Sequence, residues 1–328
     1  MTRLALIGGS EVATSYQSVS SRLPHIVFSA VVEGNPETAR RVAESLGAPI
    51  SAGSFEDLLA LNADAFDAVL MHRPVEPVTS IAEAAAKAGK HMMIASPLAP
   101  TAAAAAGIVE TCRSAGVRLM AGHSLRFMPS QQTVKEALAA GNLGDPGLLR
   151  IHRWRPSRND KTSKHNDGMM EMALDGIDLA NWLFAGLPTE VYAWGHSDYV
   201  QVHLGFPAGG MALIDCACTL PEGDDYFSLS LIGSTGATYA DDHHNRNLLF
   251  GGGEPRAINT AQGPFHLIKQ LEEFVSAIEE QREPAVTAAE AVAALQVAEA
   301  AAESIASKCA MRLTRDEYGT TGGAYEPA

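Results

Sequence analysis

The chain has 328 residues, of which 46% are hydrophobic and 19% charged, and its formal net charge is −14 at pH 7. This length suits two domains of ordinary size, and the apolar content is sufficient for packed cores and excludes global disorder. A net negative surface repels phosphate backbones and anionic lipids, so we expect neither nucleic acid nor a membrane as a partner.

The N-terminus and the cysteines indicate a cytoplasmic protein. The first residues enter a strand-like pattern without the apolar core of a signal peptide, and no apolar run approaches the roughly 20 residues of a membrane span. The four cysteines, at 112, 216, 218 and 309, fit neither a disulfide framework nor a paired zinc site. We expect reduced thiols. We also expect the run at 241–244, rich in Asp and His, to be a solvated loop, so no metal site is predicted.

Short apolar strands alternate with helices over residues 1–121. The expected strands are 4–8, 26–32, 68–71, 91–94 and 117–121, and the expected helices are those ending at 46 and 89 and one over 101–115. Buried strands separated by helices form parallel β-α-β units with helices on both faces of the sheet. We therefore predict an α/β domain of the Rossmann type over residues 1–121.

The pattern changes after Gly122 and favours a second, α+β domain over residues 122–328. We expect helices at 129–140, 168–184, 264–281 and 287–307, a strand at 148–154, a polar loop at 156–168 and further strands between 191 and 250. Consecutive strands without helices between them indicate a large, mostly antiparallel, open sheet. One face of this sheet has apolar residues at alternating positions, among them Met211, Leu213 and Ala217, and we expect other protein surface to cover it.

The first strand runs into a loop that departs from the dinucleotide-binding pattern G-x-G-x-x-G. The loop reads Gly8-Gly9-Ser10-Glu11-Val12-Ala13, with Ser10 at the second glycine position and Ala13 at the third. The second glycine is where the backbone approaches the pyrophosphate most closely, and Glu11 adds negative charge beside an anionic ligand. The strand-turn-helix context favours the fold, but we expect NAD to bind weakly, or to have been lost.

Glu33 ends the second strand, where dinucleotide-binding folds carry an acid that binds the adenosine ribose hydroxyls. A carboxylate at this position disfavours the 2′-phosphate of NADP, so NAD is the expected cofactor. The alternative is a solvated glutamate at a strand end.

Seven segments form a recognisable series along the chain: 86–91, 96–99, 122–129, 141–144, 175–178 with Trp182, 233–236 and 299–304. In their order and spacing they resemble the Gfo/Idh/MocA family of sugar and polyol oxidoreductases over nearly the whole chain. The resemblance implies hydride transfer between bound NAD(P) and a carbon of a sugar-like substrate. It also implies that the open sheet packs against that of a second copy, so we expect a homo-oligomer, a dimer or a tetramer.

The chain departs from this family at the positions that matter for catalysis. Ser96, in Ala95-Ser96-Pro97, stands where the family has a lysine, and Asp175 stands where it has a histidine, four residues after the retained acid Glu171. The family's Pro-Asn-x-x-His element begins with Pro74 but loses both polar residues.

The motif and the resemblance together assign candidate site residues. The expected cofactor contacts are Gly8, Ser10, Glu11, Val12, Glu33, Pro74, Ser96 and Pro97. The expected substrate contacts are His123, Arg126, Glu171 and Asp175, and the candidate catalytic residues are Glu171, Asp175, Ser96 and His165.

Alcohol oxidation needs a base for the hydroxyl proton, and a serine without an activating partner cannot act as one. Glu171 and Asp175 lie on one helical face, so one of the two carboxyls can hold a proton at neutral pH. Such a pair can form an acid/base couple, bind a metal or a cationic substrate, or be two hydrogen-bonded carboxylates without chemistry.

Three functions therefore stay open. The first is a divergent NAD-dependent oxidoreductase acting on a sugar- or polyol-like molecule. The second is a redox-inactive family member that serves as a scaffold, a subunit or a metabolite-binding protein. The third is a carboxylate- or metal-assisted lyase or hydrolase on the same fold.

Overall fold

A computed structural model of the chain describes residues 1–10, 13–72, 78–156, 165–221, 226–241, 246–250, 256–259, 265–315 and 321–327. The chain forms two compact units, one of Met1–Phe127 with Gly263–Val292 and the other of Met128–Gln262 with Ala293–Ala328. The expected division after residue 121 differs from this because residues 263–292 return to the first unit. There the Ala121 N–H donates to Val286 O at 3.3 Å.

The first unit contains a six-stranded parallel sheet of order β3-β2-β1-β4-β5-β6. Its strands are β1 (Thr2–Ile7), β2 (Ile26–Val32), β3 (Ile50–Ala52), β4 (Ala68–Met71), β5 (His91–Ala95) and β6 (Leu119–Gly122). β1 is central, and its residues from Leu4 to Ile7 are buried because neighbours cover them on both faces. The predicted Rossmann-type α/β fold is confirmed.

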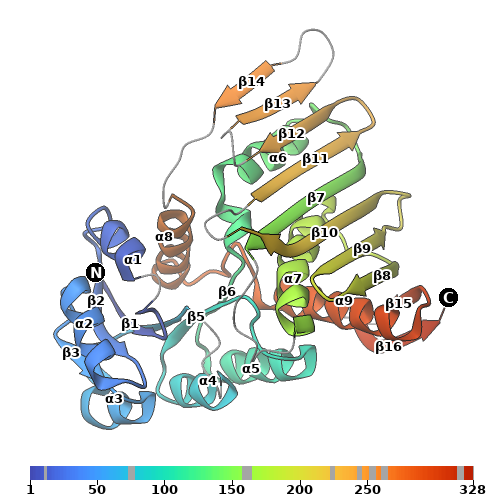
Figure 1. Cartoon of the computed structure of the whole chain (residues 1–328). Helices are drawn as coiled ribbons and strands as arrows, with labels where there is room; N and C mark the ends of the chain where they lie inside the picture. Colours follow the sequence, from blue (N-terminus) through green and yellow to red (C-terminus); the bar gives the residue numbers. More distant parts are fainter. Residues whose placement is uncertain are drawn as a thin grey trace. The chain divides into compact units, whose positions relative to one another are not determined.

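Helices flank this sheet on both faces (Figure 1). They are α1 (Ala13–Ser20), α2 (Pro36–Leu46), α3 (Phe55–Asn62), α4 (Val78–Lys87), α5 (Ala102–Ala115) and α8 (Phe265–Glu279), with the short 3-10 helices η2 (Ala63–Ala65) and η3 (Ser124–Phe127). The sequence marks their ends: Asn35 accepts from the backbone N–H groups of Glu37 and Thr38, and Gly47 ends α2 in the left-handed conformation.

The second unit contains a ten-stranded sheet of order β14-β13-β12-β11-β7-β10-β9-β8-β15-β16. Its strands are β7 (Pro146–Pro156), β8 (Glu190–His196), β9 (Tyr199–Gly205), β10 (Met211–Leu220), β11 (Tyr226–Gly233), β12 (Ala237–Asp241), β13 (Arg246–Phe250), β14 (Arg256–Asn259), β15 (Met311–Arg315) and β16 (Thr321–Pro327). Only β7 and β10 pair in parallel among the strand pairs described. The predicted mostly antiparallel sheet is confirmed.

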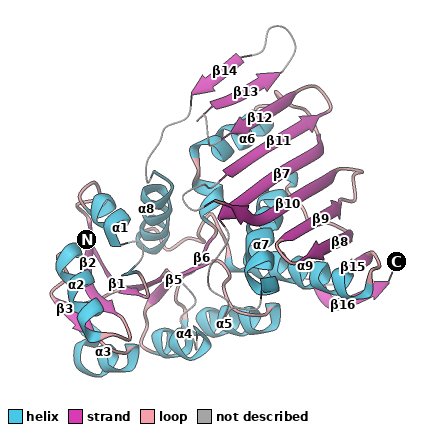
Figure 2. Cartoon of the chain, in the orientation of Figure 1, coloured by secondary structure: helices cyan, strands magenta, loops and turns pink. Residues whose placement is uncertain are grey.

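The helices of the second unit pack on one face of this sheet (Figure 2). They are α6 (Pro129–Ala139), α7 (His165–Phe184) and the part of α9 (Ala288–Ser307) from Ala293 onward. The prediction for the start of α7 is wrong: residues 165–168 are helical, whereas the sequence indicated a loop up to 168. The first turn carries polar residues without apolar periodicity, so the pattern becomes visible only after it. A Cβ on Gly176 would lie 2.7 Å from Ile214 Cγ2, so α7 approaches β10 closely at this glycine.

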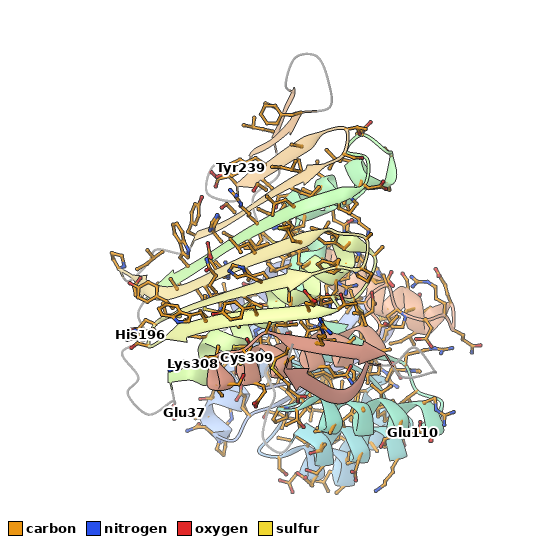
Figure 3. All side chains as sticks on the ribbon, turned by 90° about the vertical axis from the view of Figure 1, so that its right-hand side faces the viewer. Glu37, Glu110, His196, Tyr239, Lys308 and Cys309 are labelled. Atoms are coloured by element: carbon orange, nitrogen blue, oxygen red, sulfur yellow. The ribbon has the colours of Figure 1, made fainter. Side chains whose placement is uncertain are left out.

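The opposite face of the sheet carries aromatic and apolar side chains that no described helix covers. Along β8, Val191 and Ala193 are buried while Tyr192 and Trp194 are exposed, and Met211 is exposed on β10. Cys216 points to the helix-covered side, and Cys218 Sγ lies 3.4 Å from Met172 Sδ of α7. Figure 3 looks onto the uncovered face, with Tyr239 of β12 labelled. In the part of the chain that the structure describes, no helix is both long and apolar enough to cross a membrane.

Candidate cofactor site

Five residues mark the carboxyl edge of the parallel sheet, one after each of five strands. They are Gly8, Glu33, His72, Ser96 and His123, which follow β1, β2, β4, β5 and β6. Parallel strands end at a common edge, and the strand order reverses between β1 and β4, where α/β sheets bind their ligands. All of these except His72 were predicted as site residues from the sequence. Its position directly after the strand at 68–71 could have revealed it.

The loop after β1 requires its first two glycines. Gly8 has a φ of 64°, which side chains other than glycine rarely adopt. A Cβ on Gly9 would lie 2.6 Å from Leu6 Cδ2, so a larger residue would collide with the buried side chain of Leu6. Ser10 is exposed, and the predicted contacts Glu11 and Val12 lie outside the described residues. The chain thus keeps the tight turn that lets the backbone approach a pyrophosphate.

Glu33 is held against this loop. Its Oε1 accepts hydrogen bonds from the backbone N–H groups of Gly9 at 3.0 Å and Ser10 at 2.9 Å. The half-buried carboxylate therefore lies beside the loop and is hydrogen-bonded to it. A carboxylate at this place fits the ribose of a dinucleotide bound over the loop.

Tyr16 and His72 meet above β1 and β4. The Tyr16 hydroxyl lies 3.2 Å from His72 Nδ1, and the two rings meet edge to face with centroids 5.7 Å apart. Tyr16 is only 2% exposed, and its ring packs against Phe28 of β2. Burial raises the pKa of Tyr16 well above its ordinary value, so the phenol keeps its proton.

The ends of β5 and β6 bring Ser96 and His123 to neighbouring positions. Ala95 pairs with Gly122, and a Cβ on Gly122 would lie 2.6 Å from Ala95 Cα. Ser96 and His123 are the next residues on these strands. Ser96 Oγ is buried and has no hydrogen-bond partner among the described residues, and the peptide to Pro97 is cis. His123 is buried, and Pro74 lies outside the described residues.

Arg126, expected at the substrate, is engaged within the first unit. Its side chain is 3% exposed, and Nη1 lies 2.8 Å from Glu290 Oε1. Glu290 Oε2 also accepts from the N–H and the hydroxyl of Thr287, which form a capping box at the start of α9. Burial alone would raise the pKa of Glu290, but Arg126 and Thr287 hold it below its ordinary value. This ion pair fixes the guanidinium of Arg126 beside the start of α9.

The remaining candidates lie in the second unit, on α7. Glu171 is exposed and Asp175 is half-buried, one helical turn apart. Burial, and then the charge of Asp175, raise the pKa of Cys216 to about 12, so this thiol stays protonated. His165 begins α7, but its side chain lies outside the described part.

Two observations bear on metal binding. Asp241 is buried in β12, so the sequence expectation of a solvated loop is wrong at this residue, and residues 242–244 lie outside the described ones. Among the described residues, no three His, Cys, Asp or Glu side chains form a group that could hold a metal ion.

Two family descriptions match most of the chain. Residues 2–123 match the NAD-binding Rossmann fold of the oxidoreductase family, and residues 135–313 match its C-terminal alpha/beta domain. The chain belongs to the Gfo/Idh/MocA oxidoreductase family. The resemblance seen in the sequence is therefore confirmed.

Known relatives span nearly its whole length. Inositol 2-dehydrogenase of Rhizobium meliloti is 24% identical over 330 residues, covering 93% of this chain and 97% of the relative. D-xylose 1-dehydrogenase (NADP(+)) 2 of Haloferax volcanii is 26% identical over 311 residues, covering 87% of this chain and 91% of the relative. An oxidoreductase from Agrobacterium radiobacter, solved in complex with NAD+, L-tartaric acid and magnesium, has a TM-score of 0.81 and 18% identity. That match covers 95% of this chain and 98% of the other.

The residues at the carboxyl edge fit a dinucleotide. The loop keeps the two glycines that its turn requires, a carboxylate stands beside the loop, and a buried hydroxyl without a described partner lies two strands away at Ser96. These features belong to the first unit, which matches the NAD-binding domain of the family.

Proposed function

We propose that this chain is an NAD-linked oxidoreductase that acts on a sugar- or polyol-like small molecule. The observation that carries the proposal is the contact of Glu33 with the backbone N–H groups of Gly9 and Ser10, because a carboxylate beside such a loop can bind the ribose hydroxyls of a dinucleotide. The relatives that act on inositol and xylose support the substrate class.

The cofactor is held, in this proposal, by residues that follow four strands, β1, β2, β4 and β5. The loop would take the pyrophosphate, Glu33 the adenosine ribose, and Ser96 with Pro97 the nicotinamide end; Glu11, Val12 and Pro74 would complete the contacts. The chemistry that NAD would supply there, when bound, is a hydride acceptor for the substrate carbon. Ser10 puts a side chain where a glycine would leave the backbone bare, so binding is weaker than in relatives with the full glycine pattern.

The substrate hydroxyl proton needs an acceptor from the protein. His123 follows Gly122 of β6, which pairs with Ala95 of β5, so it comes directly after the same residue pair as Ser96, and its imidazole is the proposed acceptor. Ser96 Oγ can orient the hydroxyl by a hydrogen bond but cannot retain its proton. Glu171, Asp175 and His165 on α7 are proposed to contact the substrate.

One observation favours a second candidate, a redox-inactive member that binds a metabolite. The resemblance to the family implies a lysine at the position of Ser96, whose hydroxyl is buried without a described partner. A buried hydroxyl supplies one hydrogen bond and no charge, so it can hold a ligand without catalysing the transfer.

The uncovered sheet face supports assembly of two or more copies. Trp194, Tyr199 and Met211 are more than half exposed there. The polar groups between them pair with one another: His152 Nδ1 lies 2.9 Å from Asp215 Oδ2, and Gln201 donates to Asp215 at 2.6 Å. The polar side chains of this face are hydrogen-bonded to one another, so burying them needs no partner groups, and the exposed aromatic rings can pack against the same face of a second copy. We therefore propose a dimer or a tetramer.

A cytoplasmic location accompanies the proposed function. Cys112, Cys216, Cys218 and Cys309 form no disulfide in the described structure, and reduced thiols persist in a reducing compartment.

Calorimetric titration of the protein with NAD, NADP, NADH and NADPH tests the proposal. NAD and NADH should bind, and both should bind more tightly than their phosphorylated counterparts. Oxidation of myo-inositol and D-xylose is then followed by NADH absorbance. If NAD binds but neither these nor related polyols are oxidised, the second candidate holds, and if no dinucleotide binds, the oxidoreductase proposal fails.

A further inference from the structure

A row of polar side chains crosses the uncovered face of the ten-stranded sheet, the face that Figure 3 looks onto. The strand register aligns one residue from each of five neighbouring strands in this polar row: Asp241 of β12, Ser228 of β11, His152 of β7, Asp215 of β10 and Gln201 of β9. Apolar and aromatic side chains lie on both sides of it along the strands. They are Ile232 and Met211 on one side, and Tyr226, Trp154 and Tyr199 on the other.

The exposed apolar side chains of the described structure gather on this face. Six of the eight large ones belong to the ten-stranded sheet, at Tyr192, Trp194, Tyr199, Met211, Ile232 and Phe250. A monomer rarely exposes so many together, so another protein surface should cover them. Because apolar side chains flank the polar row on both sides, a second copy turned by 180° can set apolar on apolar and one polar row on the other. A second copy of this chain is therefore the partner that the pattern fits.

Asp215 is held from two sides within the polar row. His152 Nδ1 lies 2.9 Å from Asp215 Oδ2, and Gln201 Nε2 donates to Asp215 Oδ1 at 2.6 Å. Gln201 Oε1 lies 3.1 Å from His203 Nε2 of the same strand. The contact with His152 is the largest cause that holds the pKa of Asp215 below its ordinary value, against its partial burial. Asp215 is therefore a carboxylate at neutral pH.

Contact with a second copy would remove water from this carboxylate. The side chains of His152 and Asp215 are 32% and 28% exposed, so both still reach solvent in the single chain. A carboxylate that loses its water is costly unless an opposite charge compensates it, and a protonated His152 supplies that charge from within the chain. Other titratable or charged side chains face the pair from the neighbouring strands: Arg150 on β7, Tyr226 on β11, Asp241 on β12 and His203 on β9.

We infer that the polar row is the centre of a contact with a second copy of this chain, and that forming this contact binds protons at His152. The inference rests on the assembly proposed above and adds its regulation. With a neutral His152 the contact would bury an uncompensated carboxylate, whereas with a protonated one it buries an ion pair. The assembled state thus binds more protons than the separate chains, so association strengthens as pH falls. Imidazoles change charge between about pH 5 and 8, which gives the range to test.

Sedimentation equilibrium at pH 6, 7 and 8 and constant ionic strength measures the association. We expect the dissociation constant of the oligomer to be about tenfold lower at pH 6 than at pH 8, a net uptake of roughly half a proton per association step. Lower pH also reduces the repulsion between two chains of net charge −14, so variants must show where the protons bind.

Two substitutions in the polar row separate its charge from its packing. Asp215→Asn keeps the shape and removes the charge, so most of the pH dependence should disappear and association at pH 8 should tighten. His152→Asn puts an amide at the position of Nδ1 without a titrating group, so association should be as weak at pH 6 as at pH 8. His203→Gln should keep the dependence, because His203 contacts the amide of Gln201 and not the carboxylate. His25→Gln, at an exposed histidine of the first unit, is the matched control.

The inference is overturned while the proposed assembly stands if the oligomer has the same dissociation constant at pH 6 and pH 8, or a higher one at pH 6. It is also overturned if Asp215→Asn or His152→Asn responds to pH as strongly as the protein without substitutions. If the protein is a monomer at every pH, both the proposed assembly and this inference are wrong.

Discussion

Glu33 accepts a hydrogen bond from the backbone N–H of Ser10 at 2.9 Å, with one carboxylate oxygen that also accepts from Gly9. A residue at the end of β2 thus orders the loop at the end of β1. The acid would have two roles in a dinucleotide complex: it holds the loop, and it stands where a 2′-phosphate would have to fit.

Glu33→Gln separates these roles, because the amide oxygen can still accept from both N–H groups while the charge is gone. We expect the preference for NAD over NADP to fall about tenfold or more, mostly through tighter NADP binding, since about 1.4 kcal/mol of charge repulsion corresponds to a factor of ten. Calorimetry with both dinucleotides measures this. An unchanged ratio would show that Glu33 does not face the ribose.

Ser10 is the second test of the loop. Ser10→Gly should tighten NAD binding about three- to tenfold, because removing Cβ lets the pyrophosphate approach the backbone. Ser10→Ala keeps Cβ and is the matched control, for which no gain is expected. A loss of affinity in the glycine variant would mean that the Ser10 side chain itself binds the cofactor.

The strands that flank this loop could be predicted from sequence. The run at 26–32 is β-branched, apolar on both faces and closed by Glu33-Gly34-Asn35-Pro36, and the structure has β2 at Ile26–Val32. β3 was not predicted because three residues at the sheet edge, two of them half-buried, give no periodicity. The start of α7 was misplaced for the related reason that its first turn is polar.

The contacts within the site could not be predicted in the same way. Tyr16 and His72 are 56 residues apart, and Arg126 and Glu290 are 164 apart. These pairs depend on strand order and on the return of residues 263–292 to the first unit, neither of which is encoded by local patterns. The strand-end positions of Glu33, Ser96 and His123 were predictable because parallel strands end at one edge.

The Arg126–Glu290 pair predicts a pH-dependent contribution to stability. Arg126→Met should lower the free energy of unfolding by about 1–2 kcal/mol at pH 7, moderated by solvent because the Glu290 side chain is 41% exposed. The pKa of Glu290 is lowered in the fold, so its contribution is present above its unfolded pKa and is lost as pH falls through the folded value. The difference between the two proteins should therefore narrow below about pH 4.

Urea unfolding at pH 7 and at successively lower pH measures this difference, with Glu290→Gln as the control. That variant keeps an oxygen for the Thr287 N–H but has no charge to titrate, so Arg126→Met added to it should cost an amount that is independent of pH over the same range. If the free energies of unfolding of Arg126→Met and of the protein without substitutions differed by the same amount at every pH, the assigned charge interaction of Arg126 with Glu290 would be contradicted.

Two helical glycines should respond in opposite directions to alanine. Gly176→Ala should lower the unfolding midpoint, since its Cβ would meet Ile214 at 2.7 Å and such overpacking costs roughly 1–3 kcal/mol. Gly107→Ala, in α5 with no atom within 4 Å of the added Cβ, should raise stability by about 0.5–1 kcal/mol. Thermal and urea unfolding of the two variants test the packing of α7 on β10. If both substitutions changed the stability by the same amount, the close packing of α7 on β10 at Gly176 would be contradicted.

The uncovered face of the ten-stranded sheet carries the last prediction. Trp194 is 60% exposed on β8, and in an assembled protein its ring would be enclosed by a second copy. Trp194→Glu puts a charge into that contact, and an unpaired buried charge costs several kcal/mol, so a dimer or tetramer should dissociate to monomers at micromolar concentration. Light scattering coupled to gel filtration measures the mass. Leu61→Glu, in α3 of the first unit and 81% exposed, adds the same charge away from this face and should leave the mass unchanged. If the protein without substitutions is a monomer, the proposed assembly is wrong. If the Trp194→Glu variant keeps the same oligomeric state, the contact between copies lies elsewhere.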